Sequence, residues 1–442
     1  MNIDTESREI LRYISQDFVM LTSGSREMAY HIDSGDLIGQ KGFVKYCAKH
    51  YGDLVITLDD GKEERASAGA IWWSWDDPMQ RVARRLVMEP TSKSEAEDNP
   101  EVFNLWHVRK KTMVPPKLDA TIDDIAPLLD HLMYISDGDQ TVVMFFLNWL
   151  ATLYKTPEVK IPSGILMYSK FGGVGKSMLF KLLAKVFGPC MVGSCSGRAL
   201  TKPFDDVTEH KRLLMINEMA RSEKADGYEN FKNMISEEQV SFEGKGRAAK
   251  DIKNITHYIV TTNNLGALPL MQGDRRIAVF MCNTERRPDA YYEALHRWLD
   301  GPGPALVAGV LANWQFPANW NPHAPVPQTE AAKAMQKEAR GNLTVLIEEL
   351  IQEGRPPFDR DFGRVMDLNV QLNTLYANSL LRGISMNNRT LPQSLEIIGA
   401  KQRVIHHANA EGKAVTSRVW IWRDLHKWMN ESGQTMFDIM SQ

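Results

Sequence analysis

The sequence predicts an α/β fold with a mostly parallel sheet at its core, a small α+β unit before it and helices after it. Apolar residues dominate three short stretches, 165–168, 212–218 and 258–264. Strands that are buried on both faces of a parallel sheet show such continuous apolar runs. A glycine-rich turn and apolar residues at helical spacing follow the first stretch, which is the order of elements in an α/β unit.

Length and composition indicate a globular protein of several domains. The chain has 442 residues, of which 43% are hydrophobic and 24% charged. Its net charge of −3 argues against a uniformly basic nucleic-acid binder, so DNA contacts would come from local patches. The four cysteines lack the paired spacing of a zinc site, which favours free thiols in a reducing compartment.

Neither a signal peptide nor a membrane span is expected. The first residues have no basic start and no apolar core. The longest apolar run, Val142–Leu153, is too short to cross a bilayer. We therefore expect a cytoplasmic protein.

Residues 1–115 are expected to form an N-terminal accessory domain of mixed α and β structure. Leu54–Leu58, followed by Asp59-Asp60-Gly61, is typical of a strand that enters a hairpin turn. Adjacent aspartates on a strand point to opposite faces, so they make a poor two-metal polymerase site. The aromatic run 71–75 lies close to three arginines at 81–85 and has two interpretations: stacking on single-stranded bases, or filling of a small core.

Residues 116–160 are expected to form a helical collar or linker. From Ile122 to Tyr154 the apolar positions recur at helical spacing in two blocks, which the segment 136–139 separates. Two helices ahead of the core would suit a collar that holds subunits together, and a plain helical linker is the alternative.

The glycine-rich segment 169–177 has the residues and the surroundings of a phosphate-binding loop. An apolar strand precedes it, and a helix follows it until Gly188-Pro189. Backbone N–H groups in such a loop point at phosphate, and the helix N-terminus adds partial positive charge. The expected nucleotide contacts are Gly172, Gly173, Val174, Gly175, Lys176 and Ser177.

Two side chains of this loop carry the expected chemistry of a nucleoside triphosphate and its metal. Lys176 can reach the β- and γ-phosphates, and the Ser177 hydroxyl can take one coordination site on Mg²⁺. The usual motif begins with a glycine where this chain has Lys170, and the remaining glycines keep the loop supple.

Polar residues end the apolar stretch 212–218. Ligands gather at the C-terminal ends of strands in an open parallel sheet. Glu218 would therefore lie near the γ-phosphate and polarise the attacking water. Asn217 occupies the place where an aspartate usually orders Mg²⁺ through water, so we expect it to contact the metal with a weaker charge.

The next apolar strand ends in two asparagines and is followed by an arginine pair. Asn263 can hydrogen-bond both the γ-phosphate and the attacking water, with Asn264 as the alternative. Arg275 and Arg276 directly precede a further apolar strand, where they can reach a phosphate in their own chain or in a neighbouring copy.

In this order the motifs resemble those of the superfamily 3 helicases, ring-forming AAA+ ATPases of small viruses, phages and plasmid-like elements. The chain is most similar to the helicase modules of phage and satellite primase–helicase proteins, through Asn-Leu-Trp at 104–106 and Asp-Arg-Arg at 274–276. The resemblance covers about residues 100–320. It implies an AAA+ P-loop ATPase core at residues 161–325.

The family resemblance also implies roles for residues outside the phosphate loop. A hairpin ahead of the sensor strand projects into the ring channel, and the matching segment 240–253 carries four basic residues against two acidic ones. Such a positive patch suits a phosphate backbone, and a solvated charged loop is the alternative. The implied DNA contacts are Lys245, then Arg247 and Lys250. Arg276, or alternatively Arg275, would complete the site of a neighbouring subunit.

Several partners follow from the same resemblance. The chain would form a homo-oligomer, a hexameric ring, on single-stranded or forked DNA. Family members place a primase domain ahead of the motor, whereas residues 1–115 lack its carboxylate pattern. A separate primase or polymerase is therefore the expected partner, in the cytoplasm of a bacterial host.

Residues 326–442 are expected to form a C-terminal helical domain of winged-helix type. Leu343–Ile351, Leu368–Tyr376 and Leu391–Ile398 have helical spacing, and two strands flank the turn at 411–413. Such a domain could dock DNA or pack against the ring, and the sequence favours neither.

The combined interpretation is an ATP- and Mg²⁺-dependent DNA helicase that moves on single-stranded DNA during replication of a phage or mobile element. Two alternatives stay open: an ATP-switched DNA-binding or loading protein that does not unwind, and a regulatory or defence ATPase with a different partner.

Overall fold

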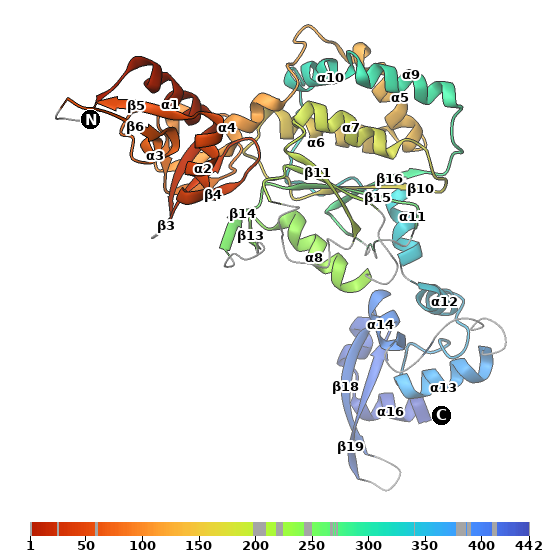
Figure 1. Ribbon diagram of the computed structural model, residues 1–442. Coiled ribbons are helices and arrows are strands. Elements are labelled where there is room, and N and C mark those ends of the chain that lie inside the picture. The colour runs from red at the N-terminus through yellow and green to blue at the C-terminus, as the bar shows by residue number, and fades with distance from the viewer. Residues whose placement is uncertain are drawn as a thin grey trace.

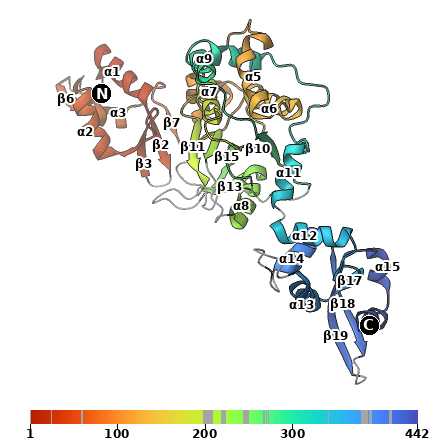
Figure 2. The ribbon, with the colours of Figure 1, turned by 90° about the vertical axis from the view of Figure 1, so that its right-hand side faces the viewer.

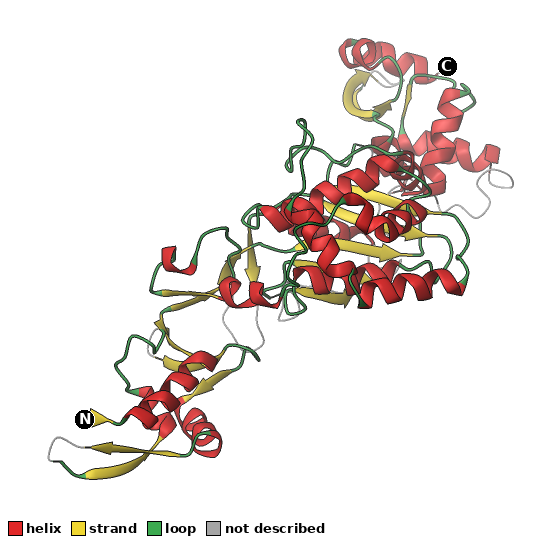
Figure 3. Cartoon of the chain, turned by 90° about the horizontal axis from the view of Figure 1, so that it is seen from above, coloured by secondary structure: helices red, strands yellow, loops and turns green. Residues whose placement is uncertain are grey.

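The computed structural model describes residues 2–23, 26–57, 61–197, 209–217, 224–242, 250–265, 268, 270, 273–339, 341–376, 386, 390–408 and 413–441. A central α/β unit lies between an N-terminal and a C-terminal unit (Figure 1). Seen from above, these two flanking units extend from opposite ends of the central one (Figure 3).

The central unit contains a five-stranded sheet in the order β11-β12-β15-β10-β16. All four neighbouring pairs are parallel. The predicted strands at 165–168, 212–218 and 258–264 are confirmed as three of the five. The strands are β10 (Gly164–Ser169), β11 (Val192–Ser196), β12 (Leu213–Asn217), β15 (His257–Thr262) and β16 (Ile277–Cys282).

Helices cover both faces of this sheet, as Figures 1 and 2 show. Ile165 and Met167 face one hydrophobic core, which contains α5 (Ala126–Ile135), α6 (Gln140–Lys155), α7 (Lys176–Phe187), α9 (Asp289–Asp300) and α10 (Gly303–Ala312). Leu166 and Tyr168 face the other core, with α8 (Lys224–Ser236) and α11 (Glu330–Ala339). Because both faces are covered, alternation of apolar and polar residues is absent from these strands.

The two predicted helices at 122–154 are confirmed as α5 and α6, and the break between them lies at 136–139. Asp139 caps α6, because its side chain accepts hydrogen bonds from the N–H groups of Thr141 (2.9 Å) and Val142 (3.2 Å). Both helices share a hydrophobic core with α7 and the sheet. The two helices of the predicted collar or linker thus belong to the core of the central unit.

The structure contains the two antiparallel strands that the sequence predicts for a hairpin ahead of β15. β13 (Gln239–Phe242) and β14 (Lys250–Lys253) pair antiparallel, with Phe242 opposite Lys250. Lys250 therefore begins the second strand. Lys245 and Arg247 lie outside the described residues.

The described part of the N-terminal unit combines one antiparallel sheet and one mixed sheet with helices. Trp72 and Trp75 are buried in its core, which supports the core-filling interpretation of the aromatic run. The elements are β1 (Asn2–Ile3), α1 (Thr5–Asp17), β2 (Phe18–Ser23), β3 (Arg26–His31), β4 (Leu37–Gly39), α2 (Gln40–His50), β5 (Asp53–Thr57), β6 (Glu63–Ser67), α3 (Ala68–Trp73) and β7 (Val82–Ala83). The predicted strand is confirmed as β5, and Asp59 and Asp60 lie outside the described residues.

A short connecting region joins this unit to the central one. Phe103 and Trp106 pack with Val19 and Leu21 of the N-terminal unit and with Met191 of the central unit. The elements here are β8 (Arg85–Val87), which pairs parallel with β9 (Val102–Asn104), and α4 (Leu105–Arg109).

In the C-terminal unit three helices precede a two-stranded hairpin, as the sequence predicts. They are α12 (Gly341–Gln352), α13 (Val365–Tyr376) and α14 (Thr390–Ile397), and the hairpin is β18 (Lys401–Ala408) with β19 (Ala414–Ile421). β17 (Phe362–Gly363) adds a third strand beside β19, and α15 (Leu425–Asn430) and α16 (Gly433–Ser441) follow.

None of the helices in the described part of the chain has both the length and the apolar character that a bilayer crossing demands.

Candidate functional site

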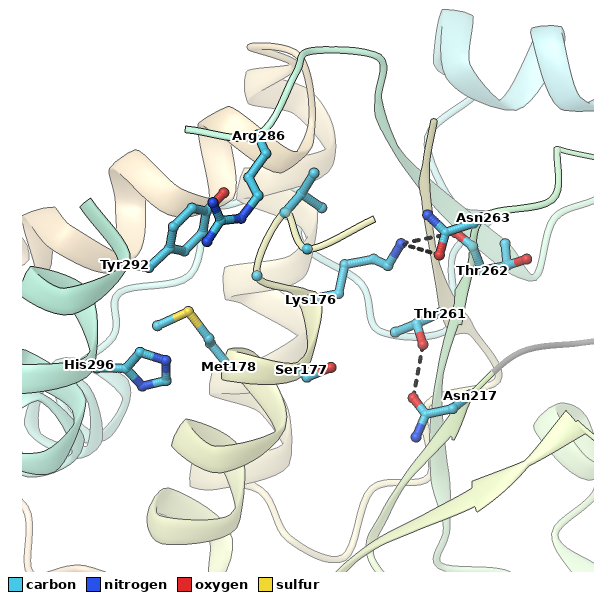
Figure 4. Close-up of a pocket in the computed structure, with 13 residues that line it drawn as sticks. Lys176, Ser177, Met178, Asn217, Thr261, Thr262, Asn263, Arg286, Tyr292 and His296 are labelled. Carbon is cyan, nitrogen blue, oxygen red and sulfur yellow. Dashed lines mark hydrogen bonds between the residues drawn. The ribbon is translucent and has the colours of Figure 1, made fainter. Parts of the chain in front are cut away.

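The candidate site is a pocket at the edge of the central sheet where β10, β12 and β15 end. Because these strands are parallel, their C-terminal residues meet at one edge. The pocket has a volume of about 400 Å³ (Figure 4). It is lined by Gly173, Val174, Gly175, Lys176, Ser177, Met178, Asn217, Thr261, Thr262, Asn263, Arg286, Tyr292 and His296.

Two glycines of the glycine-rich loop 169–177 are required by its backbone or its packing, whereas Gly172 is not. Gly175, with φ 98°, and Gly173, with φ 74°, adopt backbone conformations that L side chains rarely adopt. A Cβ at Gly175 would lie 2.6 Å from Cε1 of His131, whereas a Cβ at Gly172 would meet nothing within 4 Å. Val174 points inward instead and is buried in the core, so it fixes the loop to the body of the protein.

The loop leads directly into α7, which begins at Lys176. The first N–H groups of a helix have no partner within the helix, and they carry the positive end of its dipole. Ser177, in this first turn, is exposed at the pocket. The arrangement is that of an anion site with a hydroxyl beside it.

Lys176 extends from α7 across the loop towards β15. Its ammonium donates hydrogen bonds to the carbonyl oxygen of Thr262 (3.0 Å), to Oδ1 of Asn263 (3.5 Å) and to Oγ of Ser169. Burial lowers the pKa of Lys176 to about 8. These three partners are neutral oxygens, so the positive charge at this end of the pocket is not cancelled by them.

Asn263 holds the loop from the neighbouring strand. Its Nδ2 donates to the carbonyl oxygens of Ser169 (2.7 Å) and Phe171 (3.1 Å) and to Oγ of Ser169 (3.0 Å). The contact exists because β15 lies between β10 and β12 in the sheet. The predicted closeness of Asn263 to the phosphate loop is confirmed, and its role towards a γ-phosphate stays a prediction. Asn264 lines no part of the pocket.

Asn217 ends β12 and bridges its two neighbouring strands. Its Nδ2 donates to Oγ of Ser194 on β11 (2.8 Å), and its Oδ1 accepts a hydrogen bond from Oγ1 of Thr261 on β15 (2.9 Å). The amide thus faces the pocket from a fixed position. Glu218, the predicted water-activating residue, lies outside the described residues.

The oxygens of Ser177 and Asn217 fit a magnesium ion that is carried in with phosphate. Mg²⁺ prefers oxygen ligands and keeps several waters, with one or two protein groups and the phosphates of the substrate. Among the described residues, no group of three His, Cys, Asp or Glu side chains is placed to hold a metal on its own.

Arg275 and Arg276 lie at the N-terminal ends of the strands, which is the end of the sheet away from the pocket. Arg276 directly precedes β16, and its carbonyl oxygen accepts from the N–H of Gly164 at the start of β10 (2.8 Å). Ser169 lies five residues further along β10 than Gly164, which at 3.3 Å per residue is roughly 16 Å along the strand. The two arginines therefore cannot act on the pocket of their own chain, which corrects that part of the prediction. A role in the site of a neighbouring copy stays a prediction.

Several pocket residues were missed because they come from segments far away in the sequence. Arg286 follows β16, and Tyr292 and His296 lie on α9 one helical turn apart. The available signal was a second arginine pair, Arg286-Arg287, a few residues after an apolar strand.

His131 supports the loop from α5. Its Nε2 lies 3.3 Å from the carbonyl oxygen of Gly175, and its Nδ1 lies 3.0 Å from the hydroxyl of Tyr291. Burial lowers the pKa of His131 to about 4, so the ring is neutral at pH 7. Since a carbonyl only accepts, Nε2 carries the proton and Nδ1 accepts from Tyr291. The ring thereby connects the phosphate loop to α9.

Comparison with known proteins gives one family match and one curated relative. Residues 167–276 match a family of unknown function, DUF5906. A DNA primase-polymerase of Nitratiruptor phage NrS-1 is 26% identical over 155 residues, which cover 34% of this chain and 21% of the relative. The aligned stretch thus spans about a fifth of the length of that relative.

Solved structures extend the likeness to nearly the whole chain. An A-form apo structure of the NrS-1 C-terminal region aligns with a TM-score of 0.59 at 16% identity, covering 93% of this chain and 98% of the other. A second apo structure of that region aligns with the same TM-score at 15% identity, over 94% and 99%. The chain therefore shares its fold with the C-terminal region of this phage protein.

Proposed function

We propose that the chain is an ATP-hydrolysing motor of the superfamily 3 type, which moves single-stranded DNA during replication of a phage or mobile element. One observation carries the proposal. The ammonium of Lys176 lies at the mouth of a glycine-rich loop, and its hydrogen-bond partners Thr262 and Asn263 are neutral, so its positive charge is available to an anion. Positive charge, free helix N–H groups and an oxygen ligand for Mg²⁺ together recognise a triphosphate.

The AAA+ assignment of the core is part of this proposal. It is supported by a parallel sheet in which a strand ending in Asn263 lies between the loop strand and the strand ending in Asn217. The three helices and hairpin of the C-terminal unit likewise support, as a proposal, a domain of winged-helix type.

In the proposed reaction the chain positions ATP and a water molecule. The loop N–H groups and Lys176 hold the β- and γ-phosphates, and Ser177 and, through water, Asn217 orient the bound Mg²⁺. When bound, Mg²⁺ neutralises charge that develops on the phosphates. The carboxylate of Glu218 accepts a proton from the water, which attacks the γ-phosphorus and breaks its bond to the bridging oxygen. ADP and phosphate leave, and Asn263 fixes the loop throughout.

A ring of identical chains is part of the proposal, and the position of the arginine pair supports it. Arg275 and Arg276 precede β16, at the end of the strands away from their own pocket, so their proposed action on phosphate needs a neighbouring copy. In such a ring the β13–β14 hairpin would contact DNA through Lys245, Arg247 and Lys250. A hexamer is the proposed assembly, and the relative's name, DNA primase-polymerase, supports a setting in DNA replication with a primase or polymerase as partner.

A DNA-loading protein that hydrolyses ATP without unwinding is the second candidate. The observation that favours it is the relative's name, DNA primase-polymerase, which refers to DNA synthesis and not to strand separation.

Strand displacement on a forked DNA, measured together with ATP turnover, tests the proposal. We expect single-stranded DNA to stimulate ATP turnover and the wild-type chain to release the displaced strand. Lys245→Ala should keep basal turnover and lose displacement. DNA-stimulated turnover without displacement would support the loading protein, and turnover that DNA leaves unchanged would contradict both candidates.

A further inference from the structure

An arginine outside the pair Arg275-Arg276 lies at the pocket mouth. Arg286 follows the C-terminal end of β16, which is the edge where the pocket opens. A Cβ at Gly173 would lie 3.2 Å from Cδ and 3.3 Å from Nε of Arg286, so this side chain passes directly over the phosphate loop. Figure 4 shows it between the loop and Tyr292.

The neighbouring Arg287 has a different environment, which separates the roles of the two residues. Its guanidinium pairs with Asp130 of α5 and lies 4.5 Å from the ring centres of both Tyr134 and Tyr291. Two terminal nitrogens of the guanidinium donate to Asp130, and its flat face contacts the two rings, so Arg287 is engaged between α5 and α9. Arg287 joins two helices and thus fixes the backbone beside Arg286.

Arg286 is held more loosely and remains accessible. Its side chain is 46% exposed, and the carboxylate with which it pairs, Asp289, is 76% exposed. Its guanidinium also lies 4.7 Å from the ring centre of Tyr292, which keeps it at the pocket wall. An ion pair this exposed contributes little, whereas a phosphate offers two charged oxygens to the planar fork of an arginine.

We propose that Arg286 binds the polyphosphate of the nucleotide held in its own chain, and that it leaves Asp289 to do so. The inference rests on the proposed function, since it requires a triphosphate in the pocket. It divides the arginines into two groups: Arg286 acts within its chain, and Arg275 or Arg276 acts on a neighbour. Tyr292 positions the guanidinium, and Asp289 competes with the phosphate for it.

Equilibrium binding of a fluorescent ATP analogue to the full chain tests this proposal, at a dilution where light scattering shows single subunits. Arg286→Met keeps the apolar stem over Tyr292 and should weaken binding about 10- to 100-fold, as expected for loss of a charge-assisted pair. Arg286→Lys should recover part of the affinity. Asp289→Asn, which removes the competing charge, should bind about two- to fivefold more tightly. Arg297→Ala removes an exposed arginine of α9 outside the pocket, so it is the matched control and should bind as wild type.

The outcomes separate this inference from the proposed function. If the wild type binds the analogue and Arg286→Met binds it equally well, the inference is wrong and the proposed function stands. If the wild type binds no nucleoside triphosphate at all, the proposed function itself fails.

Mixed assemblies provide a second arm. Combining Arg286→Met chains with Lys176→Ala chains should not restore ATP turnover, because an arginine that acts in its own chain cannot complement a neighbour. Restored turnover would overturn the assignment, since it would show that Arg286 acts across a subunit boundary.

Discussion

Replacement of Gly175 by alanine should destabilise the protein through two separable effects. Gly175 has φ 98° and ψ 10°, and a left-handed backbone costs an L-residue roughly 1–2 kcal/mol. The new Cβ would also lie 2.6 Å from Cε1 and 3.0 Å from Nε2 of His131, well inside the usual contact distance of about 3.5 Å. Overpacking of a buried site costs about 1–3 kcal/mol. Together these effects amount to roughly 2–5 kcal/mol of unfolding free energy.

The neighbouring glycine is the control for this substitution. Gly172 lies in the same loop, its φ is outside the left-handed region, and a Cβ there meets nothing within 4 Å. Gly172→Ala should therefore change the unfolding free energy by no more than about 0.5 kcal/mol.

A double-mutant cycle isolates the steric part. His131→Ala removes the ring that the new methyl group meets, so Gly175→Ala with His131→Ala should lose about 1–3 kcal/mol less than the sum of the single losses. Urea unfolding, followed by circular dichroism, gives the unfolding free energy of each variant. At a constant m-value, a shift of the transition midpoint measures the change in this free energy. Equal losses in Gly175→Ala and Gly172→Ala, or additive losses in the cycle, would refute the loop geometry.

Three further predictions concern the chemistry of the pocket. The pKa of Lys176 is about 8 before a triphosphate binds and rises when the ammonium pairs with phosphate. ATP affinity should therefore be constant below about pH 8 and fall up to tenfold per pH unit above it. Lys176→Arg, titrated in the same way, should abolish this fall. Asn263→Ala removes three hydrogen bonds to the loop and should lower ATP turnover about tenfold or more, and a larger loss in Asn264→Ala would contradict the assignment. Asn217→Asp keeps an acceptor for Thr261 and adds charge, so the Mg²⁺ concentration for half-maximal turnover should fall; an unchanged requirement would show that position 217 is remote from the metal.

Much of the central unit could be predicted because its local signals are strong. A strand buried on both faces cannot alternate polar and apolar residues, so β10, β12 and β15 are visible as continuous apolar runs. The loop at 169–177 depends on glycines at fixed positions, and its expected place between β10 and α7 is confirmed. The closeness of Asn263 to this loop was predictable because polar residues at the ends of parallel strands meet at one edge.

The remaining part of the site depends on tertiary contacts that no local pattern encodes. His131 reaches the loop only because its helix, α5, packs against β16 and α9, and nothing near residue 131 in the sequence indicates a partner at Gly175. Arg286 and Arg276 are both arginines beside the same strand, and only the strand direction separates them. An arginine that precedes a parallel strand lies at the edge away from the pocket, and one that follows it lies at the pocket. This rule excludes Arg276 from the pocket of its own chain and identifies Arg286.

The account depends on the hydrolysis of ATP at the pocket that Lys176 lines. Its most direct test is the release of phosphate from ATP with Mg²⁺ and single-stranded DNA, compared between Lys176→Ala and Lys181→Ala. Lys181 is an exposed lysine of the same helix and stands outside the pocket. We expect Lys181→Ala to turn over ATP as the wild type does and Lys176→Ala to release no phosphate. Equal rates of release in the two variants would place hydrolysis elsewhere and contradict the account.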